Sequence, residues 1–404
     1  MTESAVAKTL TARKLQIDSL LALTRAINGN TKERDLYELY ELFLRNQLSV
    51  DKVVLYYHKD IWECVCSYGT SKDPSTSLIH EQLVYFKKLK NLKEEPVLGF
   101  EEFDYVIPVF HKEQPLAFAL LSTIRPDDFG TREEKLDFIE TLTNIIISAI
   151  ENKRLFKRQL TQEGLKKELE LAGKMQSMLI PSKLPSNSRI EMSAVYLPHN
   201  EIGGDYYDYI ALHDNKISFC IADVSGKGIA AALLMSNFQA NLRTLATQNL
   251  TMEKLITALN TRMCEITREE NYITLFYAKY NLQSKKLLYV NAGHVPPLLC
   301  NSRGITPLTE GTTLIGMFDP LPHITVAEMY IEEESLLMLF TDGLTELENE
   351  RHEYFGEKEL ERFLQLYHSL PPEQFNQKIM EKINDYKGYR QFSDDISLLT
   401  CKLF

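Results

Sequence analysis

The sequence has no long apolar stretch. No uninterrupted apolar run reaches the roughly 18 residues that a membrane-spanning helix needs. The first residues, Met1 to Ser4, also do not begin the charged-then-apolar pattern of a secretory signal. We therefore expect a cytoplasmic protein that does not span a membrane.

Two further absences concern cysteine pairs and positive charge. The six cysteines include no CxxC pair and no zinc-ligand spacing, which predicts reduced and mostly buried thiols. The 45 Lys and Arg residues are outnumbered by 56 Asp and Glu residues, so the net charge is −11. Because binding to nucleic acid needs a basic surface, this balance argues against nucleic acid as the main partner.

The remaining composition is that of an ordinary soluble protein. Of the 404 residues, 44% are hydrophobic and 25% are charged. A chain of this length exceeds one typical core, so we expect two domains and a connector. We place the first domain at residues 1–150, the helical connector at 151–180 and the second domain at 181–404.

The first domain begins with helical patterns and continues with strands. Two helical pieces between Leu10 and Gln47 are broken at Gly29-Asn30. The expected strands are Val53–Tyr57, Trp62–Tyr68, Tyr105–Phe110 and Leu116–Ile124. The last two are separated by a polar turn and predict a hairpin. This order resembles a GAF-type sensor domain, which we favour over a related PAS-like fold, and no residue in it indicates a particular ligand.

A long helix is expected to join the two domains. Apolar residues keep a three-four alternation from Leu136 to Leu160 and resume it from Leu165 to Leu179, which predicts a coiled coil or a bundle seam. We favour a homodimer over a helix that packs back on its own domain, because this apolar stripe is longer than one small domain can cover. Gly164 interrupts the stripe.

The second domain has a mixed pattern that starts after Pro181–Pro185 ends the helix. The expected strands are Ile190–Val195, Ile217–Ile221, Ile273–Tyr280, Lys286–Val290, Pro297–Leu299 and Leu336–Phe340. The expected helices are Ile229–Thr247, Met252–Thr267, Glu357–Tyr367 and Pro372–Tyr386. Strands joined by short turns, with paired helices between them, predict an α+β fold: an αββα sandwich of two antiparallel sheets flanked by helices.

Four aspartates stand where apolar or aromatic runs begin or end. They are Asp205, Asp223, Asp342 and Asp394. One such aspartate alone would most simply be a turn or helix-capping residue. Antiparallel sheets can bring all four to one edge, however, and we interpret the set as one site.

Four carboxylates in one cleft need compensating charge. Two unit charges about 4 Å apart repel by about 4 kcal/mol at an effective dielectric of about 20. Lys227 is the only Lys or Arg that neighbours them in sequence. Oxygen ligands with neither His nor Cys nearby favour Mg²⁺ or Mn²⁺ over zinc. The sequence therefore predicts two Mn²⁺ or Mg²⁺ ions, which would offset the four negative charges.

Glycines close to these acids leave room for a phosphate and let backbone carbonyls reach a metal. The glycines are Gly203, Gly204, Gly226, Gly228 and Gly343. The run around Lys227 is not a nucleotide-binding loop, because it lacks the GxxxxGK[ST] spacing and has glycine where Ser or Thr would bind Mg²⁺.

Seven motifs in a fixed order include these acids. They are Glu170–Pro181, Gly203–Asp208, Ala222–Gly228, Thr274–Ala278, Asn291–Leu299, Thr341–Glu346 and Asp394–Leu399. The set resembles bacterial PPM-type (protein phosphatase 2C-like) serine/threonine phosphatases, in the stress-response and sporulation branch that dephosphorylates anti-sigma-factor antagonists. The resemblance covers about Glu170 to Phe404 and includes every metal-binding aspartate of the family pattern.

The resemblance implies a role for each matching residue. Asp223 would bridge two ions, with the Val224 carbonyl on one of them, and Asp342 and Asp394 would hold the other. Asp205 would bind the first ion or hydrogen-bond to its waters. Residues expected around these ligands are Gly204, Asn291, His294 and Asp395. His294 is either structural or a proton donor. No arginine matches the phosphate clamp of eukaryotic relatives, so phosphate binding is expected to rest on the metals.

The implied function is that of a phosphoserine/phosphothreonine protein phosphatase. Two metal ions about 3.5–4 Å apart lower the pKa of a bridging water and hold it in line with phosphorus, so no covalent phosphoenzyme is required. The expected substrate is a phosphorylated anti-sigma-factor antagonist, and an unidentified small molecule or protein would act on the sensor domain, which gates the enzyme through the helical connector. Two alternatives stay open: a catalytically silent partner-binding module, and a phosphoesterase that acts on small molecules.

Overall fold

The computed structural model describes residues 3–70, 76–127, 130–331 and 333–404. The chain forms two compact units, Met1–Glu163 and Gly164–Phe404, and this division falls inside the predicted connector. Helix α4 (Arg132–Ser177) runs through the division and matches the long helix expected from the sequence. No helix in the described part of the chain combines the length and apolar character needed to cross a membrane. The six cysteines, all of them among the described residues, form no disulfide, and five are buried, as predicted.

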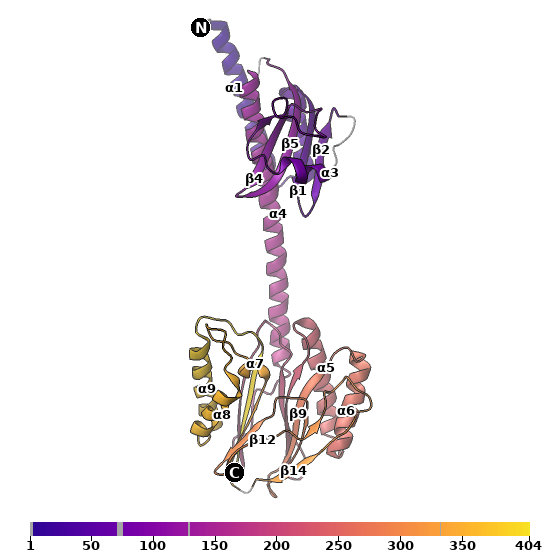
Figure 1. Ribbon diagram of the computed structural model, residues 1–404, viewed down its shortest axis with the longest axis vertical. Coiled ribbons are helices and arrows are strands. Elements are labelled where there is room, and N and C mark those ends of the chain that lie inside the picture. Colours follow the sequence, from indigo (N-terminus) through magenta and orange to yellow (C-terminus); the bar gives the residue numbers. More distant parts are fainter. Residues whose placement is uncertain (1–2, 71–75, 128–129, 332) are drawn as a thin grey trace. The chain divides into compact units, whose positions relative to one another are not determined.

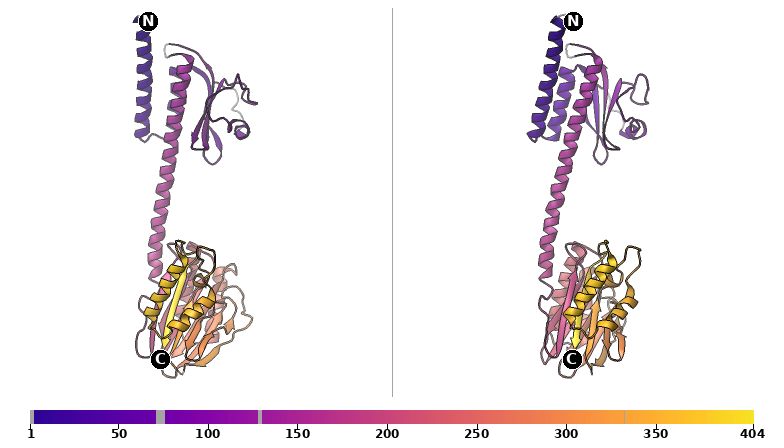
Figure 2. Two further views of the ribbon diagram at one scale, coloured as in Figure 1. Left: turned by 60° about the vertical axis from the view of Figure 1, so that its left-hand side comes forward. Right: turned by 90° about the vertical axis from the view of Figure 1, so that its left-hand side faces the viewer.

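The N-terminal unit is an antiparallel sheet with helices packed on it (Figure 2). The strand order is β2-β1-β5-β4-β3. The strands are β1 (Val50–His58), β2 (Trp62–Tyr68), β3 (Lys90–Asn91), β4 (Tyr105–His111) and β5 (Gln114–Ile124). The helical segments besides α4 are α1 (Glu3–Asn28), α2 (Glu33–Leu42), α3 (Thr76–Leu78) and two single π-turns at Phe43–Gln47 and Ile79–Leu83. All four predicted strands and the β4–β5 hairpin are confirmed, whereas β3 was missed because it has only two residues.

Both faces of this sheet are buried, which explains the unbroken apolar run in β1. Val53 and Leu55 pack against α1, α2 and α4 on one face. Val54 and Tyr56 pack on the other face against a cluster that includes Phe100. A strand covered on both sides needs apolar residues at consecutive positions rather than at alternate ones.

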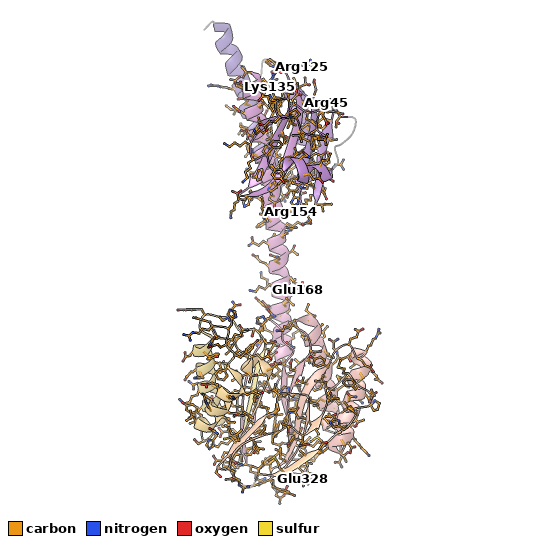
Figure 3. The ribbon with its side chains drawn as sticks, viewed as in Figure 1. Arg45, Arg125, Lys135, Arg154, Glu168 and Glu328 are labelled. Atoms are coloured by element: carbon orange, nitrogen blue, oxygen red, sulfur yellow. The ribbon has the colours of Figure 1, made fainter. Side chains whose placement is uncertain are left out.

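One lysine of this unit is fully buried, and its charge is satisfied by three oxygen atoms. Figure 3 labels Lys135 and Arg125 in the N-terminal unit. Lys135 Nζ donates to the carbonyls of Leu48 at 3.1 Å and Arg125 at 2.8 Å and lies 2.6 Å from Asp127 Oδ2. A buried ammonium is tolerated only when it is paired and hydrogen-bonded in this way. The lysine thereby joins the first turn of α4 to the segment that follows β5.

The C-terminal unit consists of two sheets between two pairs of helices (Figure 1). The first sheet has the order β13-β10-β9-β8-β7, with β14 also paired to β10, and the second has the order β12-β11-β15-β16-β6. Helices α5 (Ile229–Ala246) and α6 (Met252–Thr267) cover the first sheet, and α8 (Gly356–Tyr367) and α9 (Pro372–Lys387) cover the second. This is the predicted sandwich, and its four large helices begin and end within a residue of the predicted positions.

The strands of this unit are antiparallel to their neighbours except for β10 and β13. In the first sheet they are β7 (Tyr206–Ala211), β8 (Lys216–Val224), β9 (Ile273–Asn281), β10 (Lys286–Ala292), β13 (Gly311–Thr312) and β14 (Ala327–Tyr330). In the second they are β6 (Ile190–Leu197), β11 (Leu298–Asn301), β12 (Gly304–Pro307), β15 (Ser335–Phe340) and β16 (Ile396–Leu403).

The middle strands of the second sheet are buried on both faces. Leu337 and Leu339 of β15 point into the core between the sheets. Leu336, Met338 and Phe340 pack on the other side against α8 and α9. The strand therefore carries six consecutive buried residues. Its C-terminal end brings Asp342 close to the first sheet.

Candidate metal centre

Strand pairing in the first sheet places Asp205 and Asp223 opposite each other. Asp205 immediately precedes β7, and Asp223 is the second-to-last residue of β8. The two strands are antiparallel, with Tyr206 opposite Ala222. Continuing this register by one residue aligns the two aspartates, so a separation of eighteen positions in sequence becomes a cross-strand pair.

The second sheet brings Asp342 and Asp394 together in the same way. Asp342 begins the short helix α7 (Asp342–Thr345) after β15, and Asp394 lies just before β16. In the β15–β16 pair, Phe340 lies opposite Leu398. Gly343 makes the close approach possible, because a methyl group on its Cα would lie 2.1 Å from the Asp395 carbonyl oxygen and 3.3 Å from Asp394 Cβ.

Hydrogen bonds join these two pairs across the sandwich. Thr341 Oγ1 donates to Asp205 Oδ2 at 2.8 Å and accepts from the Ser397 amide at 2.9 Å. Asp395 accepts from the Gly204 amide at 2.7 Å. The edges of the two sheets therefore meet at one place, and the acids of both sheets surround it.

The electrostatics of the acids agree with this convergence. Burial, followed by the charges of Asp342, Asp394 and Asp395, raises the pKa of Asp223 to about 7. Burial, and then the charge of Asp223, raise the pKa of Asp205 well above its ordinary value. Asp205 therefore holds its proton more readily and stabilises the Asp223 carboxylate through a side-chain hydrogen bond. Repulsion of this kind indicates a site that requires positive charge.

A lysine contributes part of that charge. Lys227 Nζ lies 2.7 Å from Asp394 Oδ2 and 3.2 Å from the Ser393 carbonyl oxygen. In the part of the chain that the structure describes, it is the cationic side chain within ion-pair distance of the predicted metal-binding aspartates. Its charge also lowers the pKa of Asp342, which burial and Asp394 raise.

The available donor atoms fit a hard divalent cation. The Val224 carbonyl oxygen and Asp223 Oδ1 both approach Gly204, at 2.9 Å and 3.6 Å from where its Cβ would stand. All donors are oxygen atoms, which Mg²⁺ and Mn²⁺ prefer. Among the described residues, however, no three His, Cys, Asp or Glu side chains are already arranged as a closed metal-binding set. Asp394 instead pairs with Lys227.

Asp395 is occupied by backbone donors. Its Oδ1 accepts from the His199 amide and its Oδ2 from the Gly204 amide, both at 2.7 Å. Its contacts are those of a residue that fixes the loop before Asp205.

Asn291 and His294 hold the two sheets in register. The Asn291 side chain accepts from the His294 amide at 2.8 Å. His294 Nε2 lies 3.1 Å from the Phe340 carbonyl oxygen, which can only accept, so Nε2 carries the proton and Nδ1 accepts from Thr274 Oγ1 at 2.8 Å. Burial lowers the pKa of His294 to about 4. With both ring nitrogens engaged, the imidazole serves as a neutral link between β9 and β15.

Sequence patterns did not reveal the contact of α4 with the loop before Asp205. The Gln176 amide donates to the Gly203 carbonyl oxygen at 2.7 Å and accepts from the Gly203 amide at 3.1 Å. Gly173, one turn earlier, faces the Glu201 carbonyl at a distance that leaves no room for a methyl group. Both residues belong to the first of the seven motifs, but only the structure identifies what they contact.

A second unforeseen group surrounds Asp208. Arg243 of α5 donates two hydrogen bonds of 2.7 Å to its carboxylate, and Tyr206 donates a third. Asp208 is fully buried. It lies three positions after Asp205 in sequence, but strand alternation points its side chain to the helix-covered face of the sheet. There it anchors α5 rather than joining the acids.

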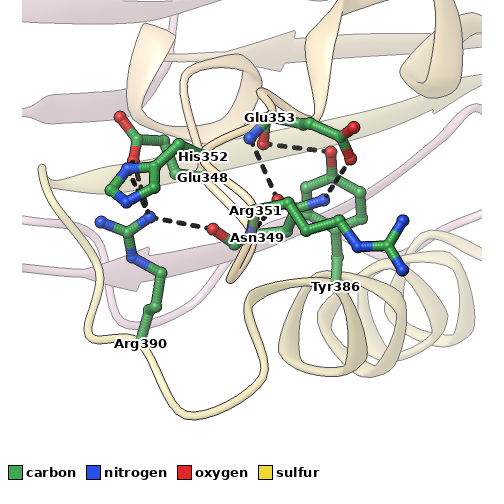
Figure 4. A network of polar contacts seen from close by, with 7 residues as sticks. All are labelled: Glu348, Asn349, Arg351, His352, Glu353, Tyr386 and Arg390. Carbon is green, nitrogen blue, oxygen red and sulfur yellow. Dashed lines mark hydrogen bonds and ion pairs between the residues drawn. The ribbon is translucent and has the colours of Figure 1, made fainter.

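The segment that leads to Asp394 is anchored by a polar network (Figure 4). Arg390 lies 2.8 Å from Glu348 Oε2 and donates to the Asn349 carbonyl oxygen at 2.9 Å. Tyr386, in the last turn of α9, donates to two carbonyls of the same loop. The network fixes the chain shortly before Asp394 although its members lie outside the acid cluster.

Comparisons with known proteins give one consistent picture. Residues 213–404 match the family model described as Stage II sporulation protein E (SpoIIE). Phosphoserine phosphatase RsbU of Bacillus subtilis (strain 168) is 26% identical over 243 residues, which are 60% of this chain and 71% of that protein. Phosphoserine phosphatase RsbP of the same strain is 30% identical over 184 residues, which are 44% of this chain and 45% of that protein.

A solved structure supports the fold. The SiaA-PP2C domain of Pseudomonas aeruginosa superposes with a TM-score of 0.55 at 17% sequence identity, and the match covers 60% of this chain and 99% of that domain. At this identity the similarity concerns the fold alone, and it covers a share of the chain close to that of the C-terminal unit.

Proposed function

We propose that this chain, which its similarity to phosphoserine phosphatases makes a hydrolase of phosphoric monoesters, is a metal-dependent phosphoserine/phosphothreonine protein phosphatase with its catalytic domain in the C-terminal unit. The proposed substrate is a phosphorylated protein of the anti-sigma-factor-antagonist type. Support comes from the relatives RsbU and RsbP, both named phosphoserine phosphatases, and from the acids that meet at one end of the sandwich.

The observation that carries this proposal is the meeting of acids from both sheets: Thr341, which precedes Asp342, donates to Asp205, and Asp395, which follows Asp394, accepts from the Gly204 amide. The charges of Asp342, Asp394 and Asp395, which raise the pKa of Asp223 after burial does, agree with this arrangement. Two divalent cations, here Mn²⁺ or Mg²⁺, would neutralise the cluster, activate a water molecule and screen the phosphate oxygens. Asp223 with the Val224 carbonyl would hold one ion, and Asp342 with Asp394 the other. Asp205, which is buried and bonded to Thr341, would orient Asp223.

The test is Mn²⁺-dependent phosphate release from a phosphoserine peptide and from a candidate antagonist protein. Asp223→Asn is expected to abolish release and Mn²⁺ binding. Asp214→Asn is a matched control, because Asp214 is an exposed aspartate in the β7–β8 turn. Wild-type activity in Asp223→Asn would contradict the proposal.

Two other outcomes would favour the alternatives. Release of phosphate from a small aryl phosphate but not from phosphoproteins would favour a small-molecule phosphoesterase. Absence of Mn²⁺ binding by calorimetry would favour a silent binding module.

Regulation is a separate part of the proposal. The N-terminal unit would act as a GAF-like sensor whose state reaches the phosphatase domain through α4. The contact of Gln176 with Gly203 supports this, because it attaches α4 directly to the loop that carries Gly204 and Asp205. A two-state element of this kind responds to a few kcal/mol of differential binding.

We also propose that α4 mediates homodimerisation. Large apolar side chains remain exposed along it, and a helix normally buries such residues against a partner. The exposed residues are Leu155, Phe156, Leu160, Leu165, Leu171 and Met175.

A further inference from the structure

The turn between β8 and α5 carries a lysine over the acid cluster. Lys227 Nζ lies 2.7 Å from Asp394 Oδ2, and 167 residues separate the two in sequence. The neighbouring glycines leave the turn open, since a methyl group on Gly226 or Gly228 would meet no described atom within 4 Å. The lysine therefore has space to move on the outer side of the cluster.

Folding stability does not account for this ion pair. The side chains of Lys227 and Asp394 are 56% and 42% exposed. Ion pairs as exposed as this one contribute little to stability, because water competes for both charges. A lysine at this position is better explained by an anion that approaches from solvent.

A bound cation would release the lysine from Asp394. Asp394 Oδ2 faces Lys227, and Oδ1 accepts from the Asp395 amide at 2.9 Å. A divalent ion on this carboxylate would repel the ammonium group, which remains near the site through its second partner, the Ser393 carbonyl oxygen, at 3.2 Å. The phosphoryl group of a substrate, bound above the same carboxylates, then becomes the nearest anion.

We propose that Lys227 is the phosphate-binding side chain of this enzyme. Its ammonium group would donate hydrogen bonds to the phosphoryl oxygens of the substrate. This inference rests on the proposed phosphatase function and extends it. The sequence offered no arginine for the role, and an ammonium group on a flexible stem suits it, because it can exchange one oxygen partner for another. In the ion-free state the same side chain neutralises Asp394.

The test uses the full chain with saturating Mn²⁺ and three variants. Lys227→Met removes the charge and keeps the length of the side chain, and Lys227→Arg keeps the charge. Lys216→Met removes a comparably exposed lysine at the opposite end of β8. Binding of inorganic phosphate is measured by calorimetry, and KM and kcat are measured on a phosphoserine peptide.

Lys227→Met is expected to weaken phosphate binding and raise KM about tenfold or more, since hydrogen bonds to charged groups contribute at least that factor. Its affinity for Mn²⁺ without phosphate should be unchanged or higher, because a competing cation is gone. Lys227→Arg should retain most of the phosphate affinity, and Lys216→Met all of it.

Unchanged phosphate affinity and KM in Lys227→Met would overturn the inference, as would weaker Mn²⁺ binding, which would make the lysine a structural counter-ion. Phosphate binding measured by calorimetry does not depend on whether the enzyme turns over a substrate. A wild-type chain that binds phosphate through Lys227 but releases none from phosphopeptides would refute the proposed phosphatase function and leave the lysine's phosphate site intact. A wild-type chain that binds no phosphate would overturn the inference itself.

Discussion

Thr341 Oγ1 donates a hydrogen bond to Asp205 Oδ2 over 2.8 Å, although 136 residues separate them. Thr341 follows the last residue of β15 and Asp205 precedes the first residue of β7. The bond therefore joins the edges of two different sheets, and it contacts the most deeply buried acid of the proposed metal centre. Relationships of this kind can be tested one residue at a time.

Replacement of Thr341 with valine is expected to lower the free energy of unfolding by about 1–3 kcal/mol, because valine keeps the shape but leaves the Asp205 carboxyl and the Ser397 amide without their partner. Mn²⁺ affinity should fall as Asp205 loses its orientation. Urea denaturation and calorimetry measure the two effects. Thr257→Val, on the exposed face of α6, is the control and should change neither. Equal stability of both variants would show that the bond between the sheets is unimportant.

The pH dependence of stability should reveal the proton on Asp223. Its pKa is about 7 in the folded chain, above the ordinary value of 3.8. Between these values the folded state binds the proton more tightly, so its stabilising effect is complete at low pH and is lost as pH rises through about 7. With a chelator present, the stability of the wild type relative to Asp223→Asn should therefore fall from pH 4 to 7 and level off above.

The comparison with Asp223→Asn removes other titrating groups, His294 among them, because both proteins contain them. Added Mn²⁺ should bind more tightly as pH rises over the same interval, since the ion needs the ionised carboxylate. A stability difference that does not change with pH would mean that Asp223 is not crowded by the other acids.

Gly343→Ala should damage the site because its new methyl group would lie 2.1 Å from the Asp395 carbonyl oxygen. We expect a loss of about 1–3 kcal/mol in the free energy of unfolding, which is typical of overpacking, together with weaker Mn²⁺ binding. Gly164→Ala in α4 is the opposite case: its methyl group would meet no described atom within 4 Å, and alanine favours a helix by about 1 kcal/mol. Thermal unfolding of both variants gives the comparison.

Gln176→Leu tests the link from α4 to the acid-bearing loop. Leucine cannot satisfy the amide and carbonyl of Gly203, so the loop should loosen and the activity of the full chain should change together with its Mn²⁺ affinity. Gln162→Leu, farther up the same helix, is the control. If Gln176→Leu retains the metal affinity and activity of the wild type, this contact does not carry regulation.

Phe156→Glu tests the proposed dimer. Phe156 is 62% exposed on α4, and a charge at this position would oppose association along the helix. Light scattering after size-exclusion chromatography should detect dimers of the wild type and monomers of the variant. Leu366→Glu changes a more exposed apolar residue on α8 and should leave the dimer intact. A monomeric wild type at micromolar concentration would refute the proposal.

Local patterns in the sequence predicted the fold well where an element has a clear period. Helix α6 begins and ends at the predicted residues, Met252 and Thr267, and the structure shows Thr251 as its N-terminal cap. The short strands β12, β13 and β14 were missed because four residues or fewer carry too little pattern, and their pairing depends on neighbours far away in the chain. The longer strands β7 and β16 were also missing from the expected strands, although the motifs that contain Asp205 and Asp394 lead directly into them.

The candidate site was predicted in part. The four aspartates could be selected because each adjoins an apolar run, but their partners could not. The bond of Gln176 to Gly203 and the ion pair of Lys227 with Asp394 arise only when distant segments meet. Asp208 shows that membership of a motif does not by itself place a residue in the site. It lies in the same glycine-aspartate motif as Asp205, but strand alternation points its side chain toward Arg243.

The position of β16 between β15 and β6 has a consequence for how the enzyme is made. On the ribosome, every other described strand emerges before β16, so the second sheet has a gap between β15 and β6, with two unpaired apolar edges, until residues 396–403 appear. Asp394 emerges just before them. The acid cluster is therefore incomplete until this segment is made, and during that interval the open edges are the surfaces that chaperones would need to shield.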